Sequence, residues 1–290
     1  MKRDLQVLTA AQVAQFLEKG WCRVEDCFSA EAAREVRERW IREQGLEPER
    51  PLEWGFEVKH QSLKESLRVK DFAPKALAAA EDLVGRGRME EWIWNNFIVN
   101  ARLGRDKPWA MPGSDGGWHI DGIFFRHYLD SPEQALLTVE LYSDVEPQGG
   151  GTALCEGSHP FTARALAEFP EGMNPFEVVA LVRSVIPFEN LSKIEAVGRA
   201  GTVYFCHPFI LHTSSPNVLG VPRFATNATV KLREPMRFND PSSASWVETS
   251  IMEALGGPKD FQITGPRRLY TPEEYKKFRE VLPLKRVKEL

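Results

Sequence analysis

The stretch "GGWHIDGIFF" (116–125) places a histidine and an aspartate two residues apart within a run of aromatic and β-branched residues. Residues of these types are typical of strands, and successive side chains of a strand point to opposite faces. On a strand, His119 and Asp121 therefore project from the same face. Polar groups in such surroundings need a specific partner, because burying them without one is costly.

The sequence around this stretch has the pattern of short strands separated by turns rich in Gly, Pro, Asn and Asp, such as "PQGGG" (147–151). Helical patterns with capping residues and glycine stops precede these strands, and one more helix follows them. Many short strands flanked by helices favour an antiparallel double sheet, a mainly β fold of the α+β class. The expected strands span 21–28, 92–103, 118–125, 135–145, 152–157, 201–215 and 223–233, and the expected helices span 8–20, 29–45, 73–85 and 271–282.

The length of 290 residues and the hydrophobic content of 42% are sufficient for one large domain with a sizeable core. We expect a mostly helical segment over 1–90, the sheet core over 92–233 and a C-terminal extension with a helix over 234–290. The formal net charge of −4 gives no basic footprint for nucleic acid or for an anionic membrane.

The N-terminal residues contain no apolar run of signal-peptide type, and no stretch approaches the length of a membrane span. The four cysteines are few and irregularly spaced, which predicts thiols that act as small core residues in a reducing compartment. We therefore expect a cytoplasmic protein that acts on a small molecule, with neither nucleic acid nor a membrane as partner.

A second histidine can complete a metal site with the histidine and aspartate of the opening stretch. His212, in "HPFILHTSSPN" (207–217), lies on a distant expected strand. Two histidines and one carboxylate on a rigid sheet form the facial triad of non-haem Fe(II) oxygenases, which leaves coordination positions open. The sequence therefore predicts His119, Asp121 and His212 as metal ligands and catalytic residues, with Fe(II) as the metal and O₂ as a reactant.

Arg223 begins the strand that follows His212. An arginine near an interior metal needs an anion as partner, and its planar guanidinium matches a carboxylate bidentately. A dicarboxylate that chelates iron at one end and meets Arg223 at the other satisfies both requirements. 2-Oxoglutarate is such a molecule, so we expect it as cosubstrate.

Four segments, in this order, resemble the phytanoyl-CoA dioxygenase family of Fe(II)/2-oxoglutarate-dependent oxygenases. They are "LTAAQVAQFLEKGWCRVEDCFS" (8–29), "WHID" (118–121), "GGGTALCEGSHP" (149–160) and "GTVYFCHPFILHTSSPN" (201–217) with the following "PR" (222–223). The resemblance implies a double-stranded β-helix core of the jelly-roll or cupin-like type. It also implies that Ser214 and Asn100 contact 2-oxoglutarate beside Arg223.

Arg126, His127 and Phe125 follow the first metal motif closely and are the candidate substrate contacts. Ile123 and Phe125 continue the ligand face by strand alternation and would form an apolar wall. Trp118 should point away from the metal into the core.

The expected reaction is oxidation, and in particular hydroxylation, of a C–H bond in a small molecule, with release of succinate and CO₂. Because a halogenase of this type needs a small residue where Asp121 stands, oxygenation is favoured over halogenation. The family's range makes a specialised (secondary) metabolite the expected substrate. Two alternatives remain open: a cupin-like metalloenzyme that does not use 2-oxoglutarate, and a jelly-roll binding protein without catalytic activity.

Overall fold

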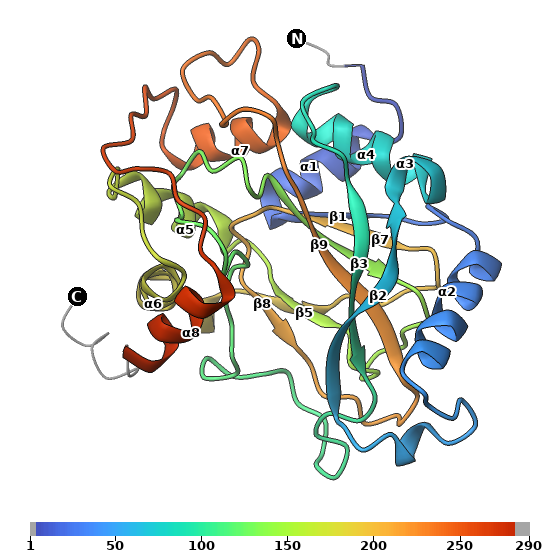
Figure 1. Ribbon diagram of the computed structural model, residues 1–290. Coiled ribbons are helices and arrows are strands. Elements are labelled where there is room, and N and C mark those ends of the chain that lie inside the picture. The colour runs from blue at the N-terminus through green and yellow to red at the C-terminus, as the bar shows by residue number, and fades with distance from the viewer. Residues whose placement is uncertain (1–3, 282–290) are drawn as a thin grey trace.

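The computed structural model describes residues 4–281, which form two antiparallel sheets flanked by helices (Figure 1). The larger sheet has the order β1-β7-β4-β9-β3-β2 and the smaller one the order β6-β5-β8. The larger sheet consists of β1 (Trp21–Val24), β7 (Val203–Cys206), β4 (Leu136–Leu141), β9 (Arg223–Val230), β3 (Ile93–Asn100) and β2 (Val58–Arg68), and the smaller one of β6 (Lys193–Glu195), β5 (Thr152–Cys155) and β8 (His212–Ser214).

Helices flank the sheets, and local sequence signals mark the ends of several of them (Figure 1). α1 begins with a capping box between Thr9 and Gln12 and ends at Gly20, whose φ of 83° suits a glycine. Asn174 with Glu177 forms the same kind of box at the start of a helix that the sequence pattern did not predict. The helices are α1 (Ala10–Lys19), α2 (Ala30–Glu43), α3 (Val69–Phe72), α4 (Pro74–Val84), α5 (His159–Ala167), α6 (Pro175–Val185), α7 (Trp246–Ala254) and α8 (Pro272–Val281), with short 3₁₀ turns at Pro51–Glu53 and Phe188–Asn190.

Each face of the larger sheet is buried against a different layer, so every residue of β4 is buried. One face joins the core formed with the N-terminal helices, which includes Phe16, Trp40 and Phe97. The other face packs on the smaller sheet in a second cluster that includes Val139 of β4 and Leu154 of β5. The fold is therefore mainly β with flanking helices around a jelly-roll core, as predicted.

Several boundaries differ from the sequence prediction. Residues 118–125 do not form a strand: only isolated bridges occur there, at His119 and Phe125, and Gly122 has a φ of +117°. The expected strand 201–215 is divided into β7 and β8 by a turn. Within 1–90, β1 and β2 both belong to the larger sheet, so this segment also supplies core strands.

The remaining expectations for the chain as a whole are met in part. The four cysteines are buried and unpaired, as expected of small core residues. Residue 282 of the expected C-terminal helix lies outside the described residues, and α8 ends at Val281. Within residues 4–281, no helix combines the length and the apolar character that a membrane crossing requires.

Candidate metal centre

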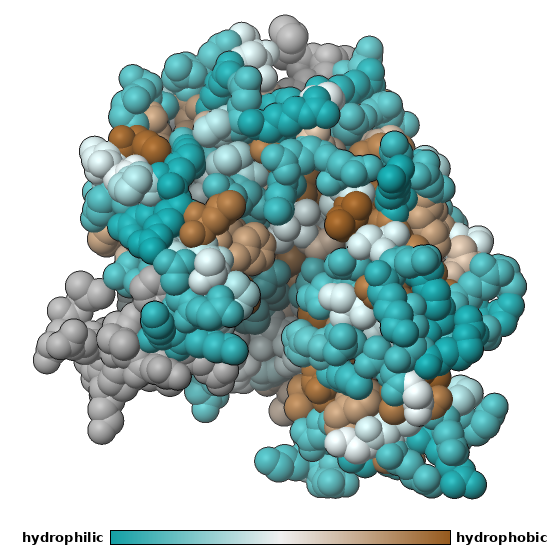
Figure 2. Space-filling view, viewed as in Figure 1, coloured by the Kyte–Doolittle hydropathy of each residue, from teal (hydrophilic) through white to brown (hydrophobic). Residues whose placement is uncertain are grey.

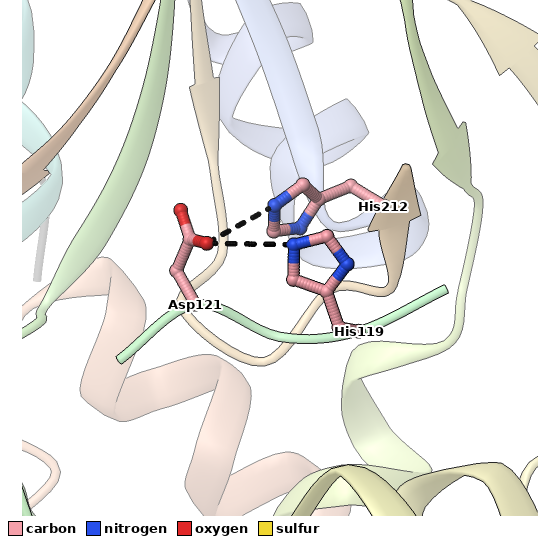
Figure 3. A group of neighbouring side chains, drawn as sticks. All are labelled: His119, Asp121 and His212. Carbon is pink, nitrogen blue, oxygen red and sulfur yellow. Dashed lines mark ion pairs between the residues drawn. The ribbon is translucent and has the colours of Figure 1, made fainter. Parts of the chain in front are cut away.

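Three side chains converge at one end of the space between the sheets: His119, Asp121 and His212 (Figure 3). Asp121 Oδ1 lies 3.6 Å from His119 Nε2 and 3.5 Å from His212 Nε2. Candidate ligand atoms of the three residues lie within 4.8 Å of one another. The structure therefore brings together the three residues that the sequence predicts as ligands.

The backbone holds the two histidines opposite each other. His212 begins β8, and His119 forms an isolated antiparallel bridge with it through hydrogen bonds of 3.1 and 3.0 Å in the two directions. Asp121 reaches the same point from the irregular segment that follows. The two histidines thus face each other across an isolated bridge and not within a regular strand.

Hydrogen bonds to the backbone orient both imidazoles. His119 Nδ1 lies 2.8 Å from the Gly117 carbonyl oxygen, and His212 Nδ1 lies 3.4 Å from that of Ile210. A carbonyl oxygen only accepts, so Nδ1 is the donor in each contact, and in the neutral imidazole the lone pair is then on Nε2, where it can bind a metal. Both Nε2 atoms face the Asp121 carboxylate, at distances too long for good hydrogen bonds.

The two Nε2 atoms and the Asp121 carboxylate oxygen face one another, and such a group of ligand atoms fits a cation. His212 Nε2 is buried and has no hydrogen-bond partner among the residues that the structure describes. Two imidazole nitrogens and one carboxylate oxygen match the ligand set of a facial triad. The same part of the chain supplies no fourth Cys, His, Asp or Glu to the group, so a bound metal would keep open positions.

The electrostatics of the group favour an ionised aspartate. Burial tends to raise the pKa of Asp121, but the charge of His212 and the contacts with both histidines outweigh it and lower this pKa below its usual value. For His119, burial tends to lower the pKa, and the contact with Asp121 reverses this into a net rise. A carboxyl group must be ionised to bind a metal. The lowered pKa keeps Asp121 in this ionised form except under acid conditions.

The three ligands line a cavity of about 590 Å³ that also reaches Arg223. The Arg223 side chain is 2% exposed, and its guanidinium donates to the carbonyls of Gly150 (2.7 Å) and Ile98 (3.0 Å). Burial lowers the pKa of Arg223 to about 10. Neither bonded group is a carboxylate, so this buried cation lies beside the cavity without a bonded anion in the described part of the chain.

The two other expected cosubstrate contacts differ in position. Ser214 lines the cavity, two residues beyond His212 on β8. Asn100 does not line it: the side chain is fully buried, donates to the Ser215 carbonyl (2.9 Å) and accepts from the Leu103 amide (3.0 Å). Asn100 is therefore bound to the backbone of the protein, away from the space that a cosubstrate could enter.

The three expected substrate contacts also lie outside the cavity lining. Arg126 donates to the carbonyls of Glu171 and Gly172, and buried His127 Nε2 lies 2.7 Å from the Gly122 carbonyl oxygen. Phe125 is 1% exposed and its ring lies against that of His127. The expected alternation of side chains between two faces does not hold here, because residues 118–125 do not form a regular strand.

The residues that do line this side of the cavity include some that sequence reasoning missed. Ile123, expected as a wall, lines it together with Phe124, whereas Trp118 lies in the core as predicted. His60, Asn96 and Asn227 line the cavity from β2, β3 and β9 and were not among the predicted site residues. For Asn227 a signal existed, because it lies four residues after Arg223 and so on the same face of β9.

The chain is similar to several solved structures. One is the non-haem α-ketoglutarate-dependent carbocyclase SnoK from nogalamycin biosynthesis (16% identity, 91% of this chain and 97% of that chain, TM-score 0.48). Others are HygX from Streptomyces hygroscopicus with nickel and 2-oxoglutarate bound (15%, 79% and 88%, 0.46) and EctD from S. alaskensis with 2-oxoglutarate and 5-hydroxyectoine (16%, 92% and 90%, 0.46). No family model matches the chain, and no curated protein matches it.

Proposed function

We propose that this protein is an Fe(II)- and 2-oxoglutarate-dependent dioxygenase that hydroxylates a C–H bond of a small molecule. The observation that carries the proposal is the pairing of two features in one cavity. The His119–Asp121–His212 group fits a metal with open positions, and the buried guanidinium of Arg223 beside it is bonded to backbone carbonyls and to no carboxylate of the described residues. 2-Oxoglutarate satisfies both, since it chelates through one end and presents a carboxylate at the other.

In this proposal each residue has a defined task. His119, Asp121 and His212 hold the iron, with the Nδ1 contacts to backbone carbonyls keeping both imidazoles oriented. Arg223 binds the distal carboxylate of 2-oxoglutarate, and the Ser214 hydroxyl, which lines the same cavity, contributes a donor. Asp121 also occupies the position that a halide would need, which favours oxygenation over halogenation.

When bound, iron supplies the activation of dioxygen that couples decarboxylation of the cosubstrate to oxidation of the substrate. The overall reaction balances as substrate C–H plus 2-oxoglutarate plus O₂ giving substrate C–OH plus succinate plus CO₂. One oxygen atom enters succinate and the other enters the product. The share of the protein is to position both organic reactants and to exclude water from the site.

The test compares metal and cosubstrate binding with turnover. Asp121→Ala should abolish Fe(II)-dependent succinate release, and it should remove the thermal stabilisation that Fe(II) gives the wild type under anaerobic conditions. Arg223→Ala should raise the KM for 2-oxoglutarate at least about tenfold, a loss of roughly 1.4 kcal/mol or more. Exposed Asn239→Leu serves as the matched control for both measurements.

The same measurements separate the alternatives. Metal binding without any 2-oxoglutarate binding would favour a cupin-like metalloenzyme that uses no such cosubstrate. Binding of both without succinate release on any candidate substrate would favour a jelly-roll binding protein. Unchanged turnover in Asp121→Ala would remove the assignment of the triad itself.

We further propose that residues 1–290 act as a single domain in the cytoplasm and that the chain is related to the phytanoyl-CoA dioxygenase family. The four segments that resemble the family, read together with the convergence of two of them on one centre, support the relationship. The substrate would be a specialised metabolite.

A further inference from the structure

The cavity extends beyond the proposed iron and cosubstrate sites along the inward face of β9. Arg223, Asn227 and Thr229 share this face by strand alternation, and all three line the cavity. Arg223 is almost fully buried, whereas Lys231, just beyond the end of the strand, is exposed. The face therefore leads from the buried end of the cavity to its mouth, with Asn227 between.

Asn227 carries a buried polar atom that the fold does not use. Its Oδ1 has no hydrogen-bond partner among residues 4–281. Leaving a buried acceptor unpaired costs about 1–3 kcal/mol. Native proteins satisfy such atoms in most cases, so a donor is expected from a molecule that enters the cavity.

A second carboxamide lies next to Asn227 on the adjacent strand. The β3–β9 ladder ends at the pair Phe97–Thr226, and Asn96 and Asn227 each stand one residue beyond it. Both line the cavity, and Asn96 is exposed. A carboxamide both donates and accepts hydrogen bonds, as a hydroxyl group does. Two neighbouring carboxamides can therefore bind two neighbouring hydroxyl groups.

The wall near the mouth is apolar. Ile93, Ile123 and Phe124 line the cavity and are 44%, 51% and 38% exposed. Figure 2 shows this face of the molecule hollowed near its centre, with hydrophobic surface at the edge of the hollow. Large exposed apolar side chains grouped at a cavity favour contact with an apolar part of a ligand.

The charges that line the cavity do not favour an ionic substrate. In the proposed function, Asp121 and Arg223 are occupied by the metal and the cosubstrate. The other carboxylates and the lysine of the lining are exposed and of both signs: Glu90, Glu91 and Lys231. No buried charge in the described lining is thus left for a substrate ion, which would need one on leaving water.

Resting on the proposed function, we propose that the substrate is an uncharged molecule with neighbouring hydroxyl groups on an apolar carbon skeleton. The carboxamides of Asn96 and Asn227 bind the hydroxyl groups, and Ile123 and Phe124 contact the apolar part. Asn227 is in this view a specificity-determining residue, since its unpaired oxygen rejects analogues that lack a donor.

The test measures binding, not turnover, on enzyme loaded with Zn(II) and 2-oxoglutarate. The probes are cis- and trans-cyclohexane-1,2-diol, the corresponding 1,2-dimethoxycyclohexanes and cyclohexane-1,2-dicarboxylate, followed by saturation-transfer NMR. At least one diol should bind about tenfold more tightly than its diether and than the dicarboxylate. Asn227→Leu should raise the Kd of that diol about tenfold and leave that of the diether unchanged. Asn96→Leu should act in the same direction, and Asn239→Leu should change neither.

Several results would overturn the proposal: no binding of either diol, equal binding of diol and diether, preference for the dicarboxylate, or wild-type affinity in Asn227→Leu. Calorimetric titration of 2-oxoglutarate into the same Zn(II) samples separates the two hypotheses. Absence of 2-oxoglutarate binding would count against the proposed function. Normal 2-oxoglutarate binding without diol selectivity would count against the substrate class alone.

Discussion

Glu140 on β4 is a buried carboxyl group outside the candidate site, and it makes the stability of the protein depend on pH. The side chain is 0% exposed and accepts a hydrogen bond from the Thr226 hydroxyl through Oε2. Its Oε1 has no partner in the described part of the chain. Burial raises the pKa of Glu140 to about 7, although hydrogen bonds with Thr138 and Thr226 oppose the rise.

The sign and size of the effect follow from this pKa. In the unfolded chain the group titrates near 4.5, so between that value and about 7 the folded protein binds more protons than the unfolded one. The free energy of unfolding therefore falls as pH rises through this interval and levels off above it. At about 1.4 kcal/mol per pKa unit, the full difference is about 3 kcal/mol.

Glu140→Gln removes the titrating group and nearly preserves its shape. We expect the variant to be more stable than the wild type above about pH 7.5, by up to about 3 kcal/mol, with a smaller difference at about pH 5. Urea unfolding followed by tryptophan fluorescence at a series of pH values measures both. Glu35→Gln, on the exposed part of α2, is the matched control and should keep the wild-type pH dependence. If Glu140→Gln and the wild type lost stability in parallel from pH 5 to about 8.5, the reasoning would be refuted.

Three further predictions concern stability. The Glu248 carboxylate is 1% exposed and pairs with Arg88 at 2.8 Å. Arg88→Met removes its counter-charge, so the free energy of unfolding should fall by about 2 kcal/mol, which a lower Tm in thermal melts would report. Burial lowers the pKa of His159 to about 4, so stability should fall as pH drops from about 6.5, by up to about 3 kcal/mol, and His159→Gln should flatten this acid limb in urea unfolding. Gly150 has a φ of +79°, and a Cβ added there would lie 2.5 Å from Asn100 Nδ2. Calorimetry of Gly150→Ala should therefore show a free energy of unfolding lower by at least about 2 kcal/mol. Wild-type stability of this variant would contradict the close approach.

Much of the helical structure could be predicted because its signals are local. Thr9 and Gln12 cap α1 within one turn of chain, and Gly20 ends it, so the boundaries follow from adjacent residues. The sequence pattern did not predict β2, because its residues are largely exposed and polar. Pairing with β3 stabilises this strand. α6 was missed even though Asn174 and Glu177 form a capping box.

For the site, the sequence by itself determined which residue types could bind a metal and which face of β9 carries Arg223 and Asn227. The chemistry of a side chain is given by its residue type, and the face of a strand on which it lies follows from its spacing along the chain. Only the tertiary structure decided that His119 meets His212 through one bridge, that Asn100 is bound to the backbone, and that Asn96 lies beside Asn227. These facts depend on strand register between segments about a hundred residues apart, and no local pattern determines that register.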